Sequence, residues 1–351
     1  MIRRFLMRHF RRVIVCLPGE GIFPSVQQAV ILLLCDNETS GPQGLLTLDF
    51  QALEQADFGA LKPASPWQWT SKWTHLFLSD AERTLVGDWH EQMAWESFDA
   101  YGRVEVGVVT GDNDFFVVTQ EKASRFREQN LMPIVASTKD LQGIRFGVED
   151  FRRVVARNRP AFVLNVNEPE DQLQPALRSY IREGEERKIS QRYKCRIRSP
   201  WYAVPSLWEC DAVLFRQSGE MPRVVHLAKK CSATDTIHRV TWQSPSLGRR
   251  HSVSFLNSWT LLNAELTGRS YGGGVLEIMP SEANRLPLPK PVAALEKIFE
   301  TVDERIRARR FVEAVELVDT AVCPRWVSPS ELGPIKGALQ KLVARRQSKT
   351  A

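Results

Sequence analysis

Three short runs of apolar residues open the chain and predict strands. The runs are RRVIVCL at 11–17, AVILLLC at 29–35 and LLTLDF at 45–50, separated by turns that contain Gly or Pro. Because apolar residues follow one another within each run, we expect strands covered on both faces, as in an α/β sheet. The Arg-rich residues 1–10 predict a helix that feeds the first strand. Three strands and one helix are too few for a complete α/β domain, so the pattern predicts only part of one.

A mixed pattern follows in the middle of the chain. The segment VEVGVVTGDNDFFVV at 104–118 has two apolar runs around Gly-Asp-Asn-Asp and predicts a β-hairpin. Further short apolar runs predict strands at 161–166, 211–215, 223–229 and 237–242. Between the first strands and the hairpin, residues 61–100 are rich in Trp and predict a connector that packs against a larger body.

From residue 252 onward the apolar residues have helical spacing. Residues 252–267 place four large apolar side chains on one helical face and end at Gly268; these side chains are Phe255, Trp259, Leu262 and Leu266. After Pro291 an apolar stripe with helical spacing predicts another helix; its members are Leu295, Ile298, Phe299, Val302 and Ile306. The tetrapeptide Ser328-Pro-Ser-Glu331 is a capping box with Pro at the first helical position, so we expect a last helix to begin there.

Composition adds a modest basic bias to this picture. The 351 residues are 43% hydrophobic and 25% charged, with a net charge of +6 and a pI of about 9.0. These values are ordinary for a folded protein and compatible with a nucleic-acid partner. The longest apolar run is too short to span a bilayer, so we expect no membrane segment. Six scattered cysteines without a C-x-x-C pair favour a reducing, cytoplasmic location.

The strongest basic cluster lies at 181–202, IREGEERKISQRYKCRIRSPWY. Residues 182–198 contain seven Lys or Arg and three Glu, and three aromatic residues lie among or just after these charges: Tyr193, Trp201 and Tyr202. Cations neutralise phosphates and aromatic faces stack on bases, so the mixture suits a DNA surface. The candidate DNA-binding residues are Arg192, Lys194, Arg196, Arg198, Trp201 and Tyr202. A solvated strand with extended Lys and Arg side chains explains the same composition equally well.

Three consecutive glycines mark a second candidate contact. They follow an Arg and a Tyr in the stretch Arg269-Ser-Tyr271-Gly272-Gly273-Gly274. Glycine permits close backbone approach, and Arg269 is available for a phosphate or a guanine edge, so the loop is a candidate DNA or domain contact. A tight turn that docks the preceding helix is the alternative, and the sequence does not separate the two.

Catalytic motifs are sparse. The sequence has no G-x-S-x-G elbow, no Walker A loop and no histidine pair at metal-binding spacing. Asp171, Glu186 and Lys188 are residue types that a metal-dependent nuclease uses, although their spacing is loose. A magnesium-dependent nuclease therefore remains an alternative function, and a non-catalytic DNA-binding accessory protein is another.

Five ordered segments give the chain a family resemblance over residues 1 to 290. They are RRFLMRHFRRVIV, GIFPSVQQAVILLL, VGVVTGDNDFFVV, YKCRIRSPWYAVP and LTGRSYGGGVLEIMPSEANRLPLP. In this order they resemble the C-terminal part of gamma-class adenine-N6 DNA methyltransferases of restriction–modification systems, the TaqI-like group. The resemblance implies a mixed α+β fold: part of an α/β methyltransferase sheet, a mixed target-recognition domain and a helical tail.

The same resemblance divides the chain into four parts. It implies the end of the catalytic domain at 1–60, the Trp-rich connector at 61–100, the target-recognition domain at 101–290 and the helical tail at 291–351. Phe23 matches the aromatic residue that stacks on an extruded adenine in similar enzymes.

The catalytic motifs of such enzymes have no match in the chain. We find neither the D/N-P-P-Y/F tetrapeptide nor the Gly-rich loop that binds S-adenosylmethionine in them. We therefore expect no catalytic residue and no cofactor or metal site in this chain alone. The complete enzyme would use S-adenosylmethionine, with the catalytic domain supplied by a separate polypeptide and double-stranded DNA as the other partner.

Overall fold

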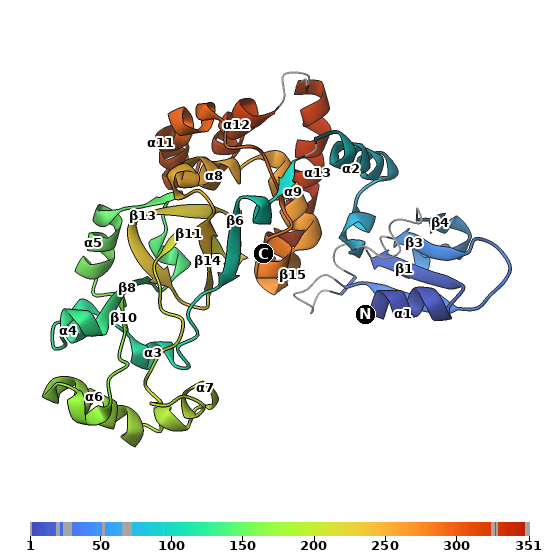
Figure 1. The fold of residues 1–351 in the computed structure, drawn as a ribbon. Helices are drawn as coiled ribbons and strands as arrows, with labels where there is room; N and C mark the ends of the chain where they lie inside the picture. Colours follow the sequence, from blue (N-terminus) through green and yellow to red (C-terminus); the bar gives the residue numbers. More distant parts are fainter. Residues whose placement is uncertain are drawn as a thin grey trace.

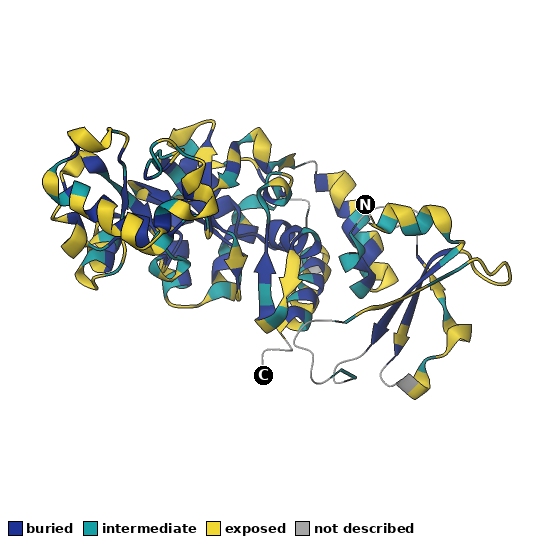
Figure 2. Ribbon diagram, turned by 90° about the horizontal axis from the view of Figure 1, so that it is seen from below, coloured by how far each residue is buried: buried dark blue, intermediate teal, exposed yellow. Residues whose placement is uncertain are grey.

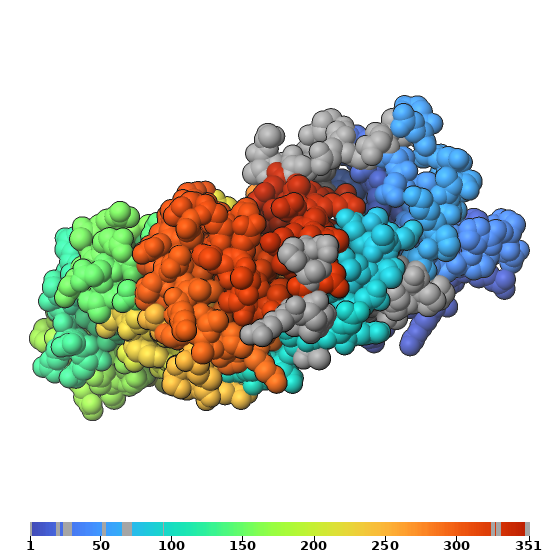
Figure 3. All heavy atoms as spheres, turned by 90° about the horizontal axis from the view of Figure 1, so that it is seen from above, coloured from blue at the N-terminus to red at the C-terminus, as the bar shows by residue number. Residues whose placement is uncertain are grey.

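The computed structural model has a mixed α+β fold with two separate sheet regions and a helical C-terminal part, as the resemblance implies (Figure 1). It describes residues 2–18, 22–23, 30–50, 53–64, 72–93, 95–323, 327 and 329–347. The first strands lie at one end of the molecule and helices α4, α6 and α7 at the other (Figure 1). Helices α11 to α13 cover the region between them (Figure 3).

The N-terminal sheet has four strands in the order β2-β1-β3-β4. Its strands are β1 (Arg12–Pro18), β2 (Leu32–Asp36), β3 (Gly44–Phe50) and β4 (Lys62–Pro63), preceded by helix α1 (Ile2–His9). Strands β1 and β3 are parallel, whereas β2 runs antiparallel to β1. The three predicted strands and the helix are therefore confirmed.

Coverage of both faces holds for only two of these strands. The β1 and β3 side chains are almost all buried, but Leu32, Leu33 and Leu34 of β2 are each about two-fifths exposed. Strand β2 lies at the edge of the sheet, where its consecutive leucines reach solvent on both faces. The expectation that both faces are covered is wrong for β2. The apolar sequence of a strand shows that its side chains can be buried, but it does not show whether other elements cover them.

An eight-stranded sheet forms the centre of the larger body. Its path is β6-β14-β11-β13-β8-β10-β7, with β9 added beside β13. The strands are β6 (Gly102–Val106), β7 (Val117–Val118), β8 (Leu131–Val135), β9 (Arg145–Phe146), β10 (Phe162–Leu164), β11 (Cys210–Phe215), β13 (Val224–Ala233) and β14 (Ile237–Trp242). All four strands predicted between 161 and 242 are confirmed, and buried residues gather in the interior of this body (Figure 2).

The hairpin predicted at 104–118 does not form. Strands β6 and β7 lie at opposite ends of the sheet path, and the short helix α3 (Asn113–Phe116) separates them. Asp112 explains the difference, because its side chain accepts a hydrogen bond from the Phe115 backbone and caps α3. The Gly-Asp-Asn-Asp segment therefore starts a helix where a turn between paired strands was expected.

The helix predicted at 252–267 is two helices, α8 (Gly248–Ser254) and α9 (Ser258–Thr267). Asn257 divides them, since its side chain accepts a hydrogen bond from Thr260 N at 2.8 Å and caps α9. Helix α9 ends before Gly268 as expected, and nine of its ten residues are buried. It is thus a central core helix of the molecule.

Three helices follow in the C-terminal part, namely α11 (Ala293–Arg307), α12 (Phe311–Val322) and α13 (Pro329–Gln347). The apolar stripe expected on α11 is confirmed, with Ile298 half-buried and the other four members fully buried. Helix α13 begins at Pro329, while Ser328 of the predicted capping box lies outside the described residues. Helix α2 (Asp80–Met93) packs with α9 and α13 in one apolar cluster.

Shorter elements complete the fold. The helices are α4 (Gln120–Ala123), α5 (Val148–Ala156), α6 (Pro175–Glu186), α7 (Tyr193–Arg196) and α10 (Pro280–Ala283). Strands β12 (Gln217–Ser218), β15 (Arg269–Tyr271) and β16 (Val275–Glu277) form a small sheet, and β5 (Glu96–Ser97) pairs with β17 (Pro287–Leu288). None of the described helices is long and apolar enough to cross a membrane.

Candidate nucleic-acid interface

The basic stretch 181–202 is helical and turn-forming. It contains the end of α6, a 3-10 turn at Ile189–Gln191 and the short helix α7, followed by turns up to residue 202. Lys188 adopts a left-handed conformation with φ of 59° and ends the α6 segment. The interpretation of this stretch as a solvated strand is wrong, and its side chains follow helix and turn geometry.

Two of the four candidate cations hold α7 in place. Arg192 forms an ion pair with Asp112 at 2.8 Å, and Asp112 is almost completely buried. The Arg198 guanidinium donates to the carbonyl oxygens of Thr110 and Val109 at 2.7 and 2.8 Å. Burial lowers the pKa of Arg198 from its usual value. Both arginines thus tie α7 to the 109–112 turn, which leaves them less available for phosphates.

The other two cations project freely from α7. Lys194 and Arg196 are exposed and lie 5.5 Å from the ring of Tyr193, which is 63% exposed. No ion pair joins either cation to a described carboxylate within 4.0 Å. Ile197 beside them is also 63% exposed. We call Tyr193, Lys194, Arg196 and Ile197 the α7 patch. It combines two unpaired positive charges with an accessible aromatic face at the lower end of the view in Figure 1.

Trp201 and Tyr202 lie beneath this patch. Tyr202 is 3% exposed and donates a hydrogen bond to the Glu168 carbonyl oxygen at 2.9 Å. Trp201 is half-buried, packs on Phe115 with ring centres 5.7 Å apart, and donates from Nε1 to Glu185 at 3.0 Å. The structure places Tyr202 in the core, where it supports the surface without reaching it.

The Gly-rich loop is built into the C-terminal packing. Gly273 has φ of 73° and no described atom within 4 Å of an added Cβ, so conformation rather than space demands glycine there. Gly274 is buried and its carbonyl accepts a hydrogen bond from Arg346 of α13. This contact ties the turn to α13, whereas the docking turn that the sequence allowed concerned the preceding helix. Arg269 and Tyr271 remain exposed, and Arg269 lies 3.6 Å from Glu282.

The remaining sequence candidates are dispersed. Phe23 is half-buried, and its neighbours at 19–21 and 24–29 lie outside the described residues. Glu186 is the last residue of α6, whose 12 residues extend over about 18 Å, and Asp171 lies in the turn Glu170–Gln172 before that helix begins. They cannot share one metal ion. No group of three or more potential metal ligands occurs among the described residues.

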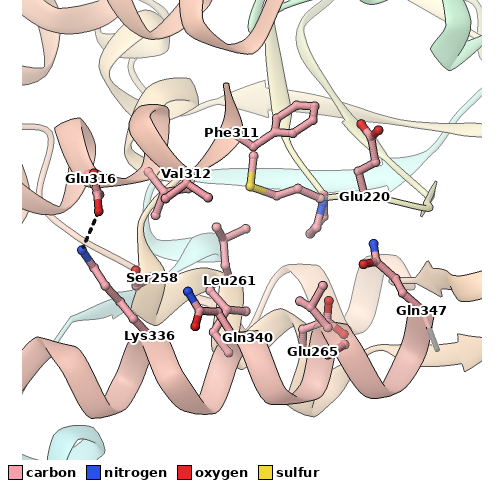
Figure 4. Close-up of a pocket in the computed structure, with 16 residues that line it drawn as sticks. Glu220, Ser258, Leu261, Glu265, Phe311, Val312, Glu316, Lys336, Gln340 and Gln347 are labelled. Atoms are coloured by element: carbon pink, nitrogen blue, oxygen red, sulfur yellow. Dashed lines mark ion pairs between the residues drawn. The ribbon is translucent and has the colours of Figure 1, made fainter. Parts of the chain in front are cut away.

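An apolar cleft lies where the tail meets the core. The cleft encloses about 610 Å³ between α9, α12 and α13, and Leu261, Phe311 and Val312 contribute to its lining (Figure 4). Lys336 lies at its rim, 3.8 Å from Glu316 and 3.6 Å from the buried Asp319. Burial raises the pKa of Asp319, which accepts two hydrogen bonds from Ser258. Ser258, Glu316, Asp319 and Lys336 thus pair with one another in the described part of the cleft.

Residues 70–323 match the family model described as the C-terminal domain of the type II methyltransferase M.Eco57I. The type II methyltransferase M.AccI of Acinetobacter calcoaceticus is 23% identical over 316 residues, which cover 81% of this chain and 55% of that protein. The crystal structure of the type IIG restriction endonuclease BpuSI aligns with 99% of this chain and 45% of its own, at 13% identity and a TM-score of 0.49.

The chain thus spans about half the length of the proteins that it matches. It corresponds to the C-terminal part of a restriction–modification methyltransferase. Since the family model matches well over half of its residues, the chain belongs to the family of the C-terminal domain of the type II methyltransferase M.Eco57I.

Proposed function

We propose that the chain recognises double-stranded DNA for a site-specific adenine-N6 DNA methyltransferase. The α7 patch carries this proposal: two exposed cations without a carboxylate partner flank an aromatic ring that is 63% exposed. Lys194 and Arg196 neutralise backbone phosphates, and Tyr193 provides a stacking face. The anchors Arg192 and Arg198 hold the patch in a fixed geometry.

Fluorescence anisotropy on duplex DNA at several salt concentrations tests this proposal. The slope of log affinity against log salt changes by roughly 0.9 for each phosphate contact. The double variant Lys194→Gln/Arg196→Gln should therefore flatten the slope by roughly two units and weaken binding to all sequences. Lys290→Gln/Lys297→Gln removes the same charge from exposed positions away from α7 and is the matched control. An unchanged slope in the α7 variant would reject the assignment.

Methyl transfer requires a catalytic half in addition to this chain. Strand β3 is followed by short 3-10 helices at Leu53–Gln55 and Phe58–Ala60, so the described residues there do not form a helix N-terminus for S-adenosylmethionine. We derive no reaction step through this cofactor. In our proposal the complete enzyme binds S-adenosylmethionine in its catalytic half, carried by a separate polypeptide, and Phe23 stacks on the extruded adenine.

Strand β2, which pairs only with β1 among the described residues, is the proposed docking site for that half. An edge strand with exposed leucines on both faces readily accepts another strand. The chain also spans only 55% of M.AccI. The unmatched part of M.AccI can serve as a probe: Leu33→Lys should abolish co-purification with it, whereas Leu45→Met in the covered strand β3 should not. Chromatography of the digested DNA for N6-methyladenine then tests the activity of the reconstituted pair.

The nuclease alternative has no supporting observation, because Asp171 and Glu186 are held far apart by α6. Pure protein with magnesium should leave plasmid DNA intact.

A further inference from the structure

A second, smaller cavity lies away from the α7 patch, near the start of the helical tail. It encloses about 390 Å³ between the 138–142 loop, the turn from β12 to β13 and the junction of α11 with α12. Four basic residues line it, and Glu220 is the only acidic one among the described lining residues; the basic residues are Lys139, Arg223, Arg307 and Arg309. The charges of this cavity differ sharply from those of the apolar cleft in Figure 4.

Arg223 is a buried cation without a carboxylate partner. It is 9% exposed, and its guanidinium lies 4.3 Å from the Phe215 ring. The only side-chain hydrogen bond that it makes to a described residue runs from Nη2 to the Leu141 carbonyl oxygen at 3.0 Å, and its buried Nε has no partner. Burial lowers the pKa of Arg223 to about 10, so the side chain remains charged at neutral pH. A buried charge in this state is costly unless an anion compensates it.

Neighbouring groups leave the excess positive charge in place. Arg309 pairs with Glu220, which removes that carboxylate as a partner for Arg223. Arg307 pairs with Asp303 and Asp150 at 2.6 and 2.9 Å. Lys139 is exposed and has no ion pair with a described residue. Among the described lining residues, Arg223 and Lys139 are therefore the two cations without an ion pair. The carboxylates of Glu220 and Asp303 raise the pKa of Arg223 less than burial lowers it.

A second buried donor lies in the same lining. Ser218 is 7% exposed, and its hydroxyl has no hydrogen-bond partner among the described residues. Hydroxyl and guanidinium groups are donors that bind tetrahedral oxyanions, and Ser218 and Arg223 both belong to the lining of this cavity.

Arg346 shows what a purely structural arginine looks like in this molecule. It is 6% exposed, pairs with Glu265 at 2.8 Å and donates to the carbonyl oxygens of Gly219, Glu220 and Gly274. Arg223 is about equally buried but has one carbonyl acceptor and no carboxylate. Arg223 therefore keeps donor capacity that no described residue uses.

We propose that this cavity binds a phosphate group, with Arg223 and Lys139 supplying the charge and Ser218 a hydrogen bond. The assignment is independent of the α7 patch and of the methyltransferase role. The phosphate comes either from a free small molecule or from the DNA backbone, and both sources present the same charged oxygens.

Calorimetric titration with inorganic phosphate, at ionic strength held constant with chloride, tests the site. The wild-type chain should bind one phosphate saturably. Arg223→Met should weaken binding by about tenfold or more, because a charge-assisted hydrogen bond is lost. Ser218→Ala should weaken it by about threefold. Lys290→Gln, which removes an exposed charge elsewhere, should leave it unchanged.

Melting temperatures separate binding from folding. Without phosphate, Arg223→Met should melt at or above the wild-type temperature, because it removes an uncompensated buried charge. If this variant does not fold, Ser218→Ala and Lys139→Gln each test the site. Absence of saturable binding at millimolar phosphate would overturn the proposal, and so would equal affinity in wild type and the variants.

A competition experiment identifies the source of the phosphate. If the site takes a backbone phosphate, inorganic phosphate should compete with a DNA duplex and Arg223→Met should weaken duplex binding. If the site takes a free phosphate, duplex binding should be the same with and without phosphate and in Arg223→Met.

Discussion

Replacing Arg346 with Met should loosen helix α13 from the rest of the molecule. The Arg346 and Glu265 side chains are 2% and 5% exposed and form an ion pair at 2.8 Å. Arg346 also donates to three backbone carbonyl oxygens, including that of Gly274 in the glycine turn. The substitution leaves Glu265 without its partner in the core and removes a donor from these carbonyl oxygens, of which that of Gly219 keeps a hydrogen bond from Gln347.

The size of the effect follows from this burial. Removing one partner of a buried ion pair costs about 3 to 5 kcal/mol, because the remaining charge stays desolvated. If the cost appears in the local opening of α13, its amide hydrogens should exchange about a hundredfold to several thousandfold faster. Glu265→Gln/Arg346→Met removes the stranded charge and should recover part of this protection.

Hydrogen exchange resolved by mass spectrometry measures the opening of α13 directly. Lys341→Met is the matched control, since Lys341 lies on the same helix and pairs with Glu82 at 2.9 Å while 47% exposed. A surface pair contributes about 1 kcal/mol or less, so the control should change exchange by about fivefold at most. If Arg346→Met changed α13 exchange no more than Lys341→Met does, the buried pair would not hold the helix.

Three further outcomes are expected. An added Cβ at Gly107 would overlap the carbonyl oxygens of Thr234 and Ile237, so Gly107→Ala should reduce the free energy of unfolding by about 3 kcal/mol or more and lower the Tm strongly. Gly273→Ala meets no such overlap and should reduce it by only about 1 kcal/mol, because of the positive φ at this position. Burial lowers the pKa of His251 to about 4. Below about pH 6.5 the folded state therefore binds fewer protons than the unfolded state, and it loses stability as the pH falls toward 4. The Tm of His251→Phe should fall less steeply than that of the wild type between pH 7 and 5. Tyr202→Ala should lower the Tm by removing a core ring without changing the salt slope of DNA binding.

Local sequence signals predicted most helices and strands, but they did not predict which elements pair or pack with one another. The apolar runs identified β1, β3 and the strands between 161 and 242, because each run is a short block of apolar residues that can be recognised without knowing its partners. The helix break at Asn257 was also readable in principle, since Asn is a favoured N-cap residue. The position of β6 and β7 at opposite ends of one sheet was not, because it depends on strand partners far away in the chain.

The glycine turn shows the same limit at a candidate site. The sequence allowed either a DNA contact or a docking turn at 272–274, and nothing nearby separated them. The structure adds a contact that the sequence did not predict, from Arg346, 72 residues after Gly274. A side chain that reaches across the molecule leaves no periodic signal, so its effect appears only in the folded structure.

The basic stretch shows why a count of charged residues overestimates the number of phosphate contacts. The sequence does not distinguish the four cations at 192, 194, 196 and 198. In the structure, Arg192 and Arg198 bind the 109–112 turn, some 80 residues earlier in the chain. A surface that used all four would change the salt slope by roughly 3.6 units, whereas the two cations free of such contacts account for roughly 1.8. Removing Arg192 or Arg198 should therefore weaken DNA binding by loosening α7, with a loss of thermal stability that Lys194→Gln and Arg196→Gln do not share. Equal effects on the slope from all four single variants, at unchanged Tm, would show that the anchors contact phosphates as well.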